Sequence, residues 1–439
     1  MVNAAGLNGK PVIEYPPDDL LIDAFNQYAR ENSGAGLGVE DQLARLELQF
    51  KLIIEKSSLY RLRKRLGIES VRKPKRRTEI ELRQVVVDLK AGDVSGGWGV
   101  TQTKGRLANS KEHILIPRDT LRLILHDEYE HEFDNRFVGK KKKLKHRVPL
   151  KALGPYHQEH SDGHEKMSEQ GLNIGAGIHL PIYGSKDQFG AFVHALLLMP
   201  NVRNAQAIAH YYLDLVENRG CLISMQLTTD MGNEVNEMHK IHQALRDEVA
   251  PEFVPPQWPH SIKESSTDNT PIEGFWRWLR NGEGHSTKMT IQSGAASGIF
   301  LPHDAIHRQT FYWLWVPLLQ EGLDRFREYW NNHKLKNSKG KLNAAGSSPR
   351  NMLLNPTSVV ATAVDVSIRV NRDSIHRLRE AYGGAAGRDK AFRFVSREFA
   401  AEADGAYVDL GCPAITLLTA WSVFEQVVAE LNKRIDVLE

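Results

Sequence analysis

Three short acidic segments in the middle of the chain limit what this sequence can fold into more than any other feature. They read His160-Ser161-Asp162-Gly163-His164, Thr228-Thr229-Asp230-Met231-Gly232-Asn233-Glu234 and Asn269-Thr270-Pro271-Ile272-Glu273. The second segment follows a short run at 222–227 with partial apolar alternation, which indicates a strand, and Met231-Gly232 indicates a turn. The carboxylate of Asp230 is therefore expected at the carboxyl end of a strand, where open α/β sheets place their sites.

The flanks of the other two segments favour the same kind of site. Asp162 lies in a polar stretch, and strand candidates follow it at 178–183 and 192–198. Glu273 opens a predicted helix that continues to Leu279. Three carboxylates from separate elements suit Mg²⁺, a hard ion that takes oxygen ligands. Two such ions about 4 Å apart can activate an attacking oxygen and stabilise a leaving one.

At these residues the chain resembles a known family, the integrase core domain of retroviral integrases and DDE transposases. It is most similar to the integrase-core proteins of eukaryotic genomes, which carry Asp-Gly-His, Thr-Asp-x-Gly-x-Glu and Asn-x-x-x-Glu boxes, the last followed by paired tryptophans. The likeness covers 151–356 and includes Trp276 and Trp278. Two positions depart from the family: Val235 stands where Asn is usual, and Phe275-Trp276 stands where the tryptophans are usually adjacent.

The resemblance implies an α/β fold with a ribonuclease-H-like core, in which Asp162, Asp230 and Glu273 are the catalytic residues and the ligands of two Mg²⁺ or Mn²⁺ ions. It implies cutting or joining of DNA by a 3′-hydroxyl or water, without a covalent enzyme intermediate. The partner would be double-stranded DNA, and a homo-oligomer would bring two DNA ends together. One alternative is a domesticated, inert DNA-binding protein that keeps the core as a scaffold. A ribonuclease-H-type nuclease acting on RNA–DNA hybrids is another.

Each proposed ligand also has a purely structural interpretation. An Asp near Gly, as at Asp162 and Asp230, is commonly a turn residue. Thr270 to Glu273 fits a capping box, with Pro271 at the first helical position and the Glu side chain reaching back. Asp268 is a rival for the third ligand. The order of the three boxes favours the metal site.

Residues 1–78 are predicted to form a first helix-turn-helix unit. Its recognition helix would place Leu59, Leu62 and Leu66 on one face, and a separate set of cations elsewhere: Arg61, Arg63, Lys64 and Arg65. A helix packed on one side and cationic on the other is how such units read DNA. Residues 56–77 contain ten Lys or Arg and one acid, so the segment carries about +9. The alternative is a solvated basic face.

Residues 79–150 are predicted to hold a second helix-turn-helix unit and a basic linker. A second recognition helix is expected from Pro117, with Arg118 and Arg122 one turn apart as phosphate or base contacts, unless Arg118 pairs with a nearby acid. The linker run at 140–147 has no acid, and Lys141, Lys142 and Lys143 are its expected DNA contacts. Together with the cluster at 73–77, this run favours import into the nucleus.

The remaining boundaries follow from the same patterns. Residues 151–335 would be the catalytic core, with 282–298 a flexible Gly- and Ser-rich segment, and 336–439 a mostly helical C-terminal region, either a dimerisation element or an end-binding domain. Two cysteines, Cys221 and Cys412, lie outside any Cys-x-x-Cys pair, which favours a reducing compartment over a disulfide framework or zinc finger. The apolar runs are too short to span a bilayer, so no membrane is expected.

Overall fold

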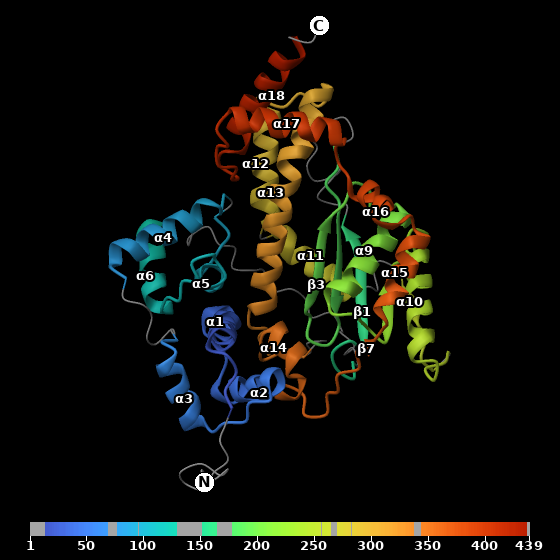
Figure 1. Ribbon diagram of the computed structural model, residues 1–439. Helices are drawn as coiled ribbons and strands as arrows, with labels where there is room; N and C mark the ends of the chain where they lie inside the picture. Colours follow the sequence, from blue (N-terminus) through green and yellow to red (C-terminus); the bar gives the residue numbers. More distant parts are fainter. Residues whose placement is uncertain are drawn as a thin grey trace, which may run out of the picture.

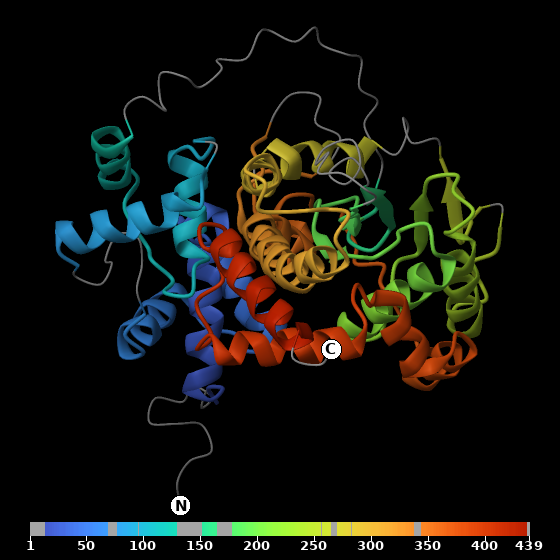
Figure 2. The same ribbon diagram turned by 90° about the horizontal axis from the view of Figure 1, so that it is seen from above.

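The computed structural model describes residues 14–68, 77–94, 96–129, 152–164, 178–255, 257–264, 270–281, 283–337 and 344–436. Within these ranges the chain forms 16 α-helices and a mixed five-stranded sheet, which confirms the predicted α/β class. The helices α1–α6 lie on one side of a long upright helix, α13 (Ala305–Asn332), and the sheet lies on the other (Figures 1 and 2). No helix in these ranges is both long and apolar enough to cross a bilayer.

The sheet combines an antiparallel meander with a parallel extension. Its order is β3-β2-β1-β5-β6. β1 pairs antiparallel with β2 and β2 with β3, whereas β1 pairs parallel with β5 and β5 with β6. The strands are β1 (Gln158–His164), β2 (Ile182–Asp187), β3 (Val193–Leu198), β5 (Gln226–Thr229) and β6 (Ser261–Lys263). A separate two-stranded sheet joins β4 (Leu222–Ile223) to β7 (Ile368–Arg369).

Helices connect the parallel strands, as crossovers between parallel strands require. α9 (Ala205–Asn218) leads from β3 towards β5, and α10 (Asn236–Val249) leads from β5 to β6. The side chain of Asn204 accepts hydrogen bonds from the first turn of α9, which explains where that helix begins. α9 and α10 share one apolar core that includes Tyr183, Ile208 and Met238.

The other large core is built around α13, which also closes the free edge of the sheet. Asn331 exchanges hydrogen bonds with the backbone of Val193 at 2.8 and 2.9 Å, and Gln320 does so with Leu196 and Leu198 at 3.0 and 2.9 Å. Residues 11 apart on a helix lie about 16 Å apart along its axis, close to the span of five strand residues. Side-chain amides thus satisfy edge groups that would otherwise be open to another strand.

The described part of the N-terminal third contains six helices in two groups of three. The first contains α1 (Asp18–Gly34), α2 (Val39–Phe50) and α3 (Lys56–Arg65), packed around Phe25, Leu46 and Leu59. The second contains α4 (Glu79–Ala91), α5 (Val100–Ala108) and α6 (Arg118–Glu128). Thr78 and Glu81 form a capping box at the start of α4.

A buried polar cluster joins the first three-helix unit to the segment around α14, which follows α13 in the chain. Glu31 pairs with Arg45 at 3.2 Å and accepts a hydrogen bond from Ser348, and Arg45 also donates to Asn351 at 3.4 Å. Ser348 caps α14 (Pro349–Leu354). Burial raises the pKa of Glu31, and Arg45 and Ser348 oppose that rise. The helical units are therefore joined to the core by contacts that a fragment ending at residue 150 would lose.

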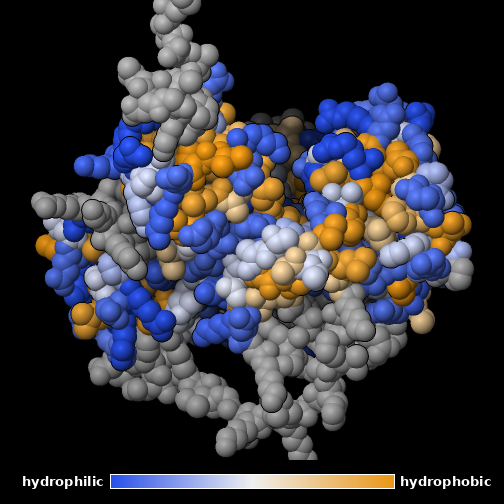
Figure 3. Space-filling model, turned by 90° about the horizontal axis from the view of Figure 1, so that it is seen from below, coloured by the Kyte–Doolittle hydropathy of each residue, from blue (hydrophilic) through white to orange (hydrophobic). Residues whose placement is uncertain are grey.

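The C-terminal segment packs against the core. α18 (Ala420–Asp436) lies along α13, and Phe424 and Trp421 contact the rings of Phe300 and Phe311. α15 (Arg372–Ala381) and α16 (Gly384–Phe392) pack on α9, and α17 (Arg397–Asp409) packs on α18. The surface seen from below shows apolar patches separated by hydrophilic side chains (Figure 3).

Two local expectations were wrong. The segment predicted to be flexible at 282–298 is largely the helix α12 (Glu283–Ala296), which packs against α13 and buries Ile291, so packing overrides its Gly and Ser content. The strand expected at 178–183 begins only at Ile182. Its polar half, Gly184 to Asp187, is buried beside β1, where hydrogen bonding to both neighbours decides the conformation.

Candidate metal centre

Asp162 is held in the middle strand of the sheet. The sequence around it is polar, yet β1 is hydrogen-bonded on both sides, to β2 and to β5, and Asp162 is only 9% exposed. Side chains alternate along a strand, so Asp162 shares a face with His160 and His164, and Glu159 lies on the opposite face. The side chain of Asp162 points towards α11 (Thr270–Asn281), because Trp276 on that helix donates a hydrogen bond to it.

Asp230 lies immediately after β5, beside Asp162. The parallel register pairs His160 with Thr228, and two residues further along each strand are Asp162 and Asp230. The backbone N–H of Gly232 donates to Oδ1 of Asp230 at 3.3 Å, so the turn expected here is present. Asp230 can stabilise the turn and still act as a ligand, because only Oδ1 accepts the hydrogen bond from Gly232.

Glu273 reaches the same place from α11. This helix buries Ile272, Phe275, Trp276 and Leu279, whereas Glu273 is partly exposed. Glu273 and Trp276 are three residues apart, so they lie on the same face of the helix. The rival acid, Asp268, lies outside the described residues.

The electrostatics of Asp162 indicate that the three carboxyl groups are neighbours. The pKa of Asp162 is raised to about 7, mainly by burial, and the charges of Asp230 and Glu273 contribute to this rise while the Trp276 hydrogen bond opposes it. Burial also raises the pKa of Tyr183 well above its usual range, and Asp162, Asp230 and Glu234 add to that rise. Negative charge is therefore concentrated at this edge of the sheet.

The donor set fits a hard divalent cation in chemistry. All three groups offer carboxylate oxygens, which Mg²⁺ and Mn²⁺ prefer, and their mutual repulsion is what a bound cation would offset. In the described ranges, no group of three His, Cys, Asp or Glu side chains is arranged to hold one metal ion. The three carboxyl groups are thus neighbours that do not form a closed cage.

Several residues at this centre were missed by the sequence interpretation. Trp276 was noted only as part of a motif, and its hydrogen bond to Asp162 depends on contacts between distant segments. Lys263, at the end of β6, donates to Asn236 Oδ1 at 2.5 Å and to the Gly232 carbonyl at 3.5 Å, which braces the turn after Asp230. No local pattern distinguishes Lys263 from other surface lysines.

The predicted DNA contacts of α3 divide into two groups. Arg61 and Lys64 are exposed, as a DNA contact requires. Arg63 is half-buried and donates to Gln42 at 3.4 Å, and Arg65 forms a double hydrogen bond with Asp18 at 2.8 Å. Arg63 therefore already has a partner on α2, whereas its proposed contact with DNA stays a prediction.

On α6, both Arg118 and Arg122 are exposed. Among the described residues no acid forms an ion pair with Arg118. Its charge acts on Lys104 instead: the pKa of Lys104 is lowered by burial and by Arg118. Lys141, Lys142 and Lys143 lie outside the described residues.

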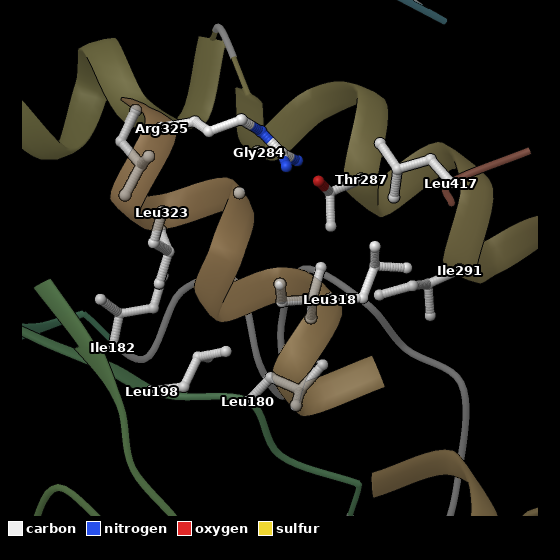
Figure 4. A pocket seen from close by; sticks show the side chains of 13 residues that line it. Leu180, Ile182, Leu198, Gly284, Thr287, Ile291, Leu318, Leu323, Arg325 and Leu417 are labelled. Carbon is white, nitrogen blue, oxygen red and sulfur yellow. The ribbon is translucent and has the colours of Figure 1, made fainter. Parts of the chain in front are cut away.

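Two of the cavities in the described part of the chain lie elsewhere, and the three carboxylates line neither of them. The smaller, of about 30 Å³, is an apolar slot between α12 and α13 lined by Leu180, Leu198 and Ile291 (Figure 4). The larger, of about 910 Å³, lies between β3, α9 and α13 and has a mixed lining with His194, Arg219 and Arg327.

Comparison with protein-family models found no match to this chain, and comparison with curated proteins found none either. Its function therefore has to be argued from the residues.

Proposed function

We propose that this protein is a DNA strand transferase or nuclease of the integrase and transposase type, which binds DNA ends and cuts or joins their phosphodiester bonds. The observation that carries the proposal is the convergence of Asp162, Asp230 and Glu273 from a middle strand, the end of its parallel neighbour and a helix. The strand order β3-β2-β1-β5-β6, antiparallel and then parallel, supports a ribonuclease-H-like core.

The three carboxylates share one role in this proposal. Asp162, Asp230 and Glu273 would hold two Mg²⁺ or Mn²⁺ ions through their carboxylate oxygens. When bound, the ions activate the attacking oxygen and stabilise the leaving oxygen. The partial exposure of Asp230 and Glu273 leaves room for a phosphate, while burial holds Asp162 in place.

The helical units would supply most of the DNA affinity. Arg61 and Lys64 on α3, and Arg118 and Arg122 on α6, are exposed cations on short helices that pack in three-helix units. Neutralising phosphates with such residues releases counterions and makes binding salt-dependent. Because DNA ends are joined in pairs, we also propose that a homo-oligomer forms on DNA.

The decisive experiment replaces each ligand without changing its shape. Asp162→Asn, Asp230→Asn and Glu273→Gln should each reduce cutting or joining of a DNA end in Mg²⁺ or Mn²⁺ by at least about 10³-fold, while DNA binding survives. The losses should not add, since the three groups act as one unit. Asp268→Asn is the control and should have little effect. If wild type binds cognate DNA ends but never cuts them, the protein is an inert scaffold and the proposal fails.

DNA binding is tested in the whole chain, because α1 is tied to the segment after the core. Replacing Arg61 and Lys64 together with Gln should weaken binding and lower the salt slope by about two, whereas Arg63→Gln should mainly reduce stability. If wild type and the Arg61/Lys64 double variant bind DNA equally well at low salt, α3 is not part of the DNA interface.

A further inference from the structure

We propose that Trp276 is a positioning residue of the carboxylate centre, because its indole N–H fixes one oxygen of Asp162 and its helix carries Glu273. The inference rests on the proposed function, since it concerns the same carboxylates. It adds a role for a side chain that the sequence alone would place in the core.

The bond itself is buried and charge-assisted. Trp276 Nε1 donates to Asp162 Oδ2 at 2.8 Å, and the indole is 2% exposed. A buried indole N–H and a buried carboxylate oxygen each need a hydrogen-bond partner, and here they are partners of one another. Oδ2 is thereby engaged with the indole. A hydrogen bond of this kind fixes the orientation of a metal ligand.

The same bond constrains Glu273. Trp276 follows Glu273 by three residues, so both side chains leave the same face of α11. Fixing Trp276 on Asp162 fixes how far α11 is rotated and how close it lies to β1. The positions of two ligands from different elements are thus linked by one hydrogen bond.

The surroundings of the indole are shaped for it. Gly184 lies opposite Asp162 on β2, and a Cβ there would come within 2.7 Å of Trp276 Cη2 and 2.9 Å of Leu196 Cδ2. The ring of His164 stacks on the indole, with centroids 5.0 Å apart and planes 11° apart. A close fit alone is also typical of a core tryptophan. The hydrogen bond is what separates the two interpretations, because Phe would keep most of the packing and lose the donor.

Trp276→Phe in the full chain tests this separation, and Trp278→Phe is the matched control on the exposed side of α11, where the side chain is 57% exposed. Mn²⁺ affinity is measured by electron paramagnetic resonance and by the Mn²⁺ concentration that gives half-maximal end cutting. Trp276→Phe should weaken Mn²⁺ binding by about 10- to 100-fold, the range for groups that orient metal ligands. Trp278→Phe should stay within about twofold of wild type.

Gly184→Ala supplies a second route to the same defect, because the added methyl group displaces the indole although Trp276 keeps its N–H donor. It should also raise the Mn²⁺ requirement. Wild-type Mn²⁺ affinity in Trp276→Phe would overturn the inference.

A third measurement separates failure of this inference from failure of the proposed function. In protein labelled with ¹⁵N-tryptophan, the indole resonance lost in Trp276→Phe is that of Trp276. It should move in Asp162→Asn, and in wild type it should move as Mg²⁺ is added, while the Trp278 resonance stays. If wild type neither binds Mn²⁺ nor cuts DNA, the proposed function fails, and the Asp162→Asn spectrum still tests the bond. An indole resonance that ignores Asp162→Asn overturns the inference.

Discussion

Two acidic residues on one strand, Glu159 and Asp162, meet opposite surroundings. Glu159 is fully buried on the α9 side of β1, and it accepts hydrogen bonds from Arg219 at 2.6 Å and Ser224 at 2.8 Å. Asp162 is nearly as buried on the other side, but it faces two further carboxylates and takes one hydrogen bond from Trp276.

The pKa values of the two groups show what the difference means. Burial alone would raise both. For Glu159 burial is the largest single influence, but Arg219, His194 and the hydrogen bond from Ser224 together outweigh it and lower the pKa to about 2, whereas the pKa of Asp162 rises to about 7. Burial therefore does not distinguish Glu159 from Asp162. The difference is that Glu159 is paired with a cationic side chain of the protein, Arg219. A buried acid that folds without one is a candidate ligand.

Removing the cation from Glu159 should produce the largest change in stability. Arg219→Met leaves the Glu159 charge buried and unpaired, and breaking a buried pair in this way costs about 3–5 kcal/mol of unfolding free energy. Asp162→Asn, by contrast, removes a repelled charge and keeps an acceptor for Trp276, so it should be neutral or stabilising. Urea denaturation of both variants measures the two effects. Equal losses would mean that the two acids do not differ as described.

Adding Mg²⁺ should increase the stability of the protein through Asp162 and not through Glu159. Mg²⁺ should stabilise wild type by about 2.7 kcal/mol at a concentration 100 times its dissociation constant. The gain should vanish in Asp162→Asn, because the ligand charge is gone. It should persist in Ser224→Ala, which alters only the surroundings of Glu159. Thermal unfolding with and without Mg²⁺ provides the measurement, and an equal gain in Asp162→Asn would place the ion elsewhere.

The pH dependence of stability should also separate the two groups. The pKa of Asp162 is about 7 in the folded chain and about 3.9 when unfolded, so its contribution is fully present below pH 4 and is lost as pH rises to 7. The slope is at most about 1.4 kcal/mol per pH unit. The contribution of Glu159 behaves oppositely, present above about pH 4.3 and lost as pH falls towards 2.

The quantity to measure is the difference in unfolding free energy between wild type and Asp162→Asn from pH 4 to 7. The subtraction is needed because burial also raises the pKa of Asp187 to about 7. A flat difference across this interval would show that the carboxyl of Asp162 is not perturbed as the geometry indicates.

Local patterns were enough to predict part of this arrangement. The run before Asp230 predicted a strand end there, and the helix predicted from Glu273 to Leu279 lies within α11.

Contacts between distant segments account for what the sequence did not reveal. Nothing in His160-Ser161-Asp162-Gly163-His164 alternates in hydropathy, yet it forms the middle strand, because two neighbouring strands bond to it. The same holds for the Arg219 pair of Glu159, which lies 60 residues away, and for the Trp276 bond of Asp162, which lies 114 residues away. The three boxes indicated which acids are candidate ligands. They did not indicate that Glu159 on β1 is paired with Arg219.

The smallest expected effect tests whether Arg219 or a hydrogen bond compensates the charge of Glu159. Ser224→Ala removes the hydroxyl that donates to Glu159 Oε2 and leaves Arg219 in place. The loss should be about 1 kcal/mol, the ordinary net contribution of one intramolecular hydrogen bond, and well below that of Arg219→Met. Urea denaturation with an unchanged m-value would show that only stability has changed. A loss as large as that of Arg219→Met would mean that the hydroxyl compensates the charge. The contrast with Asp162, whose pKa stays high despite the hydrogen bonds from Trp276 and Gly163, would then no longer hold.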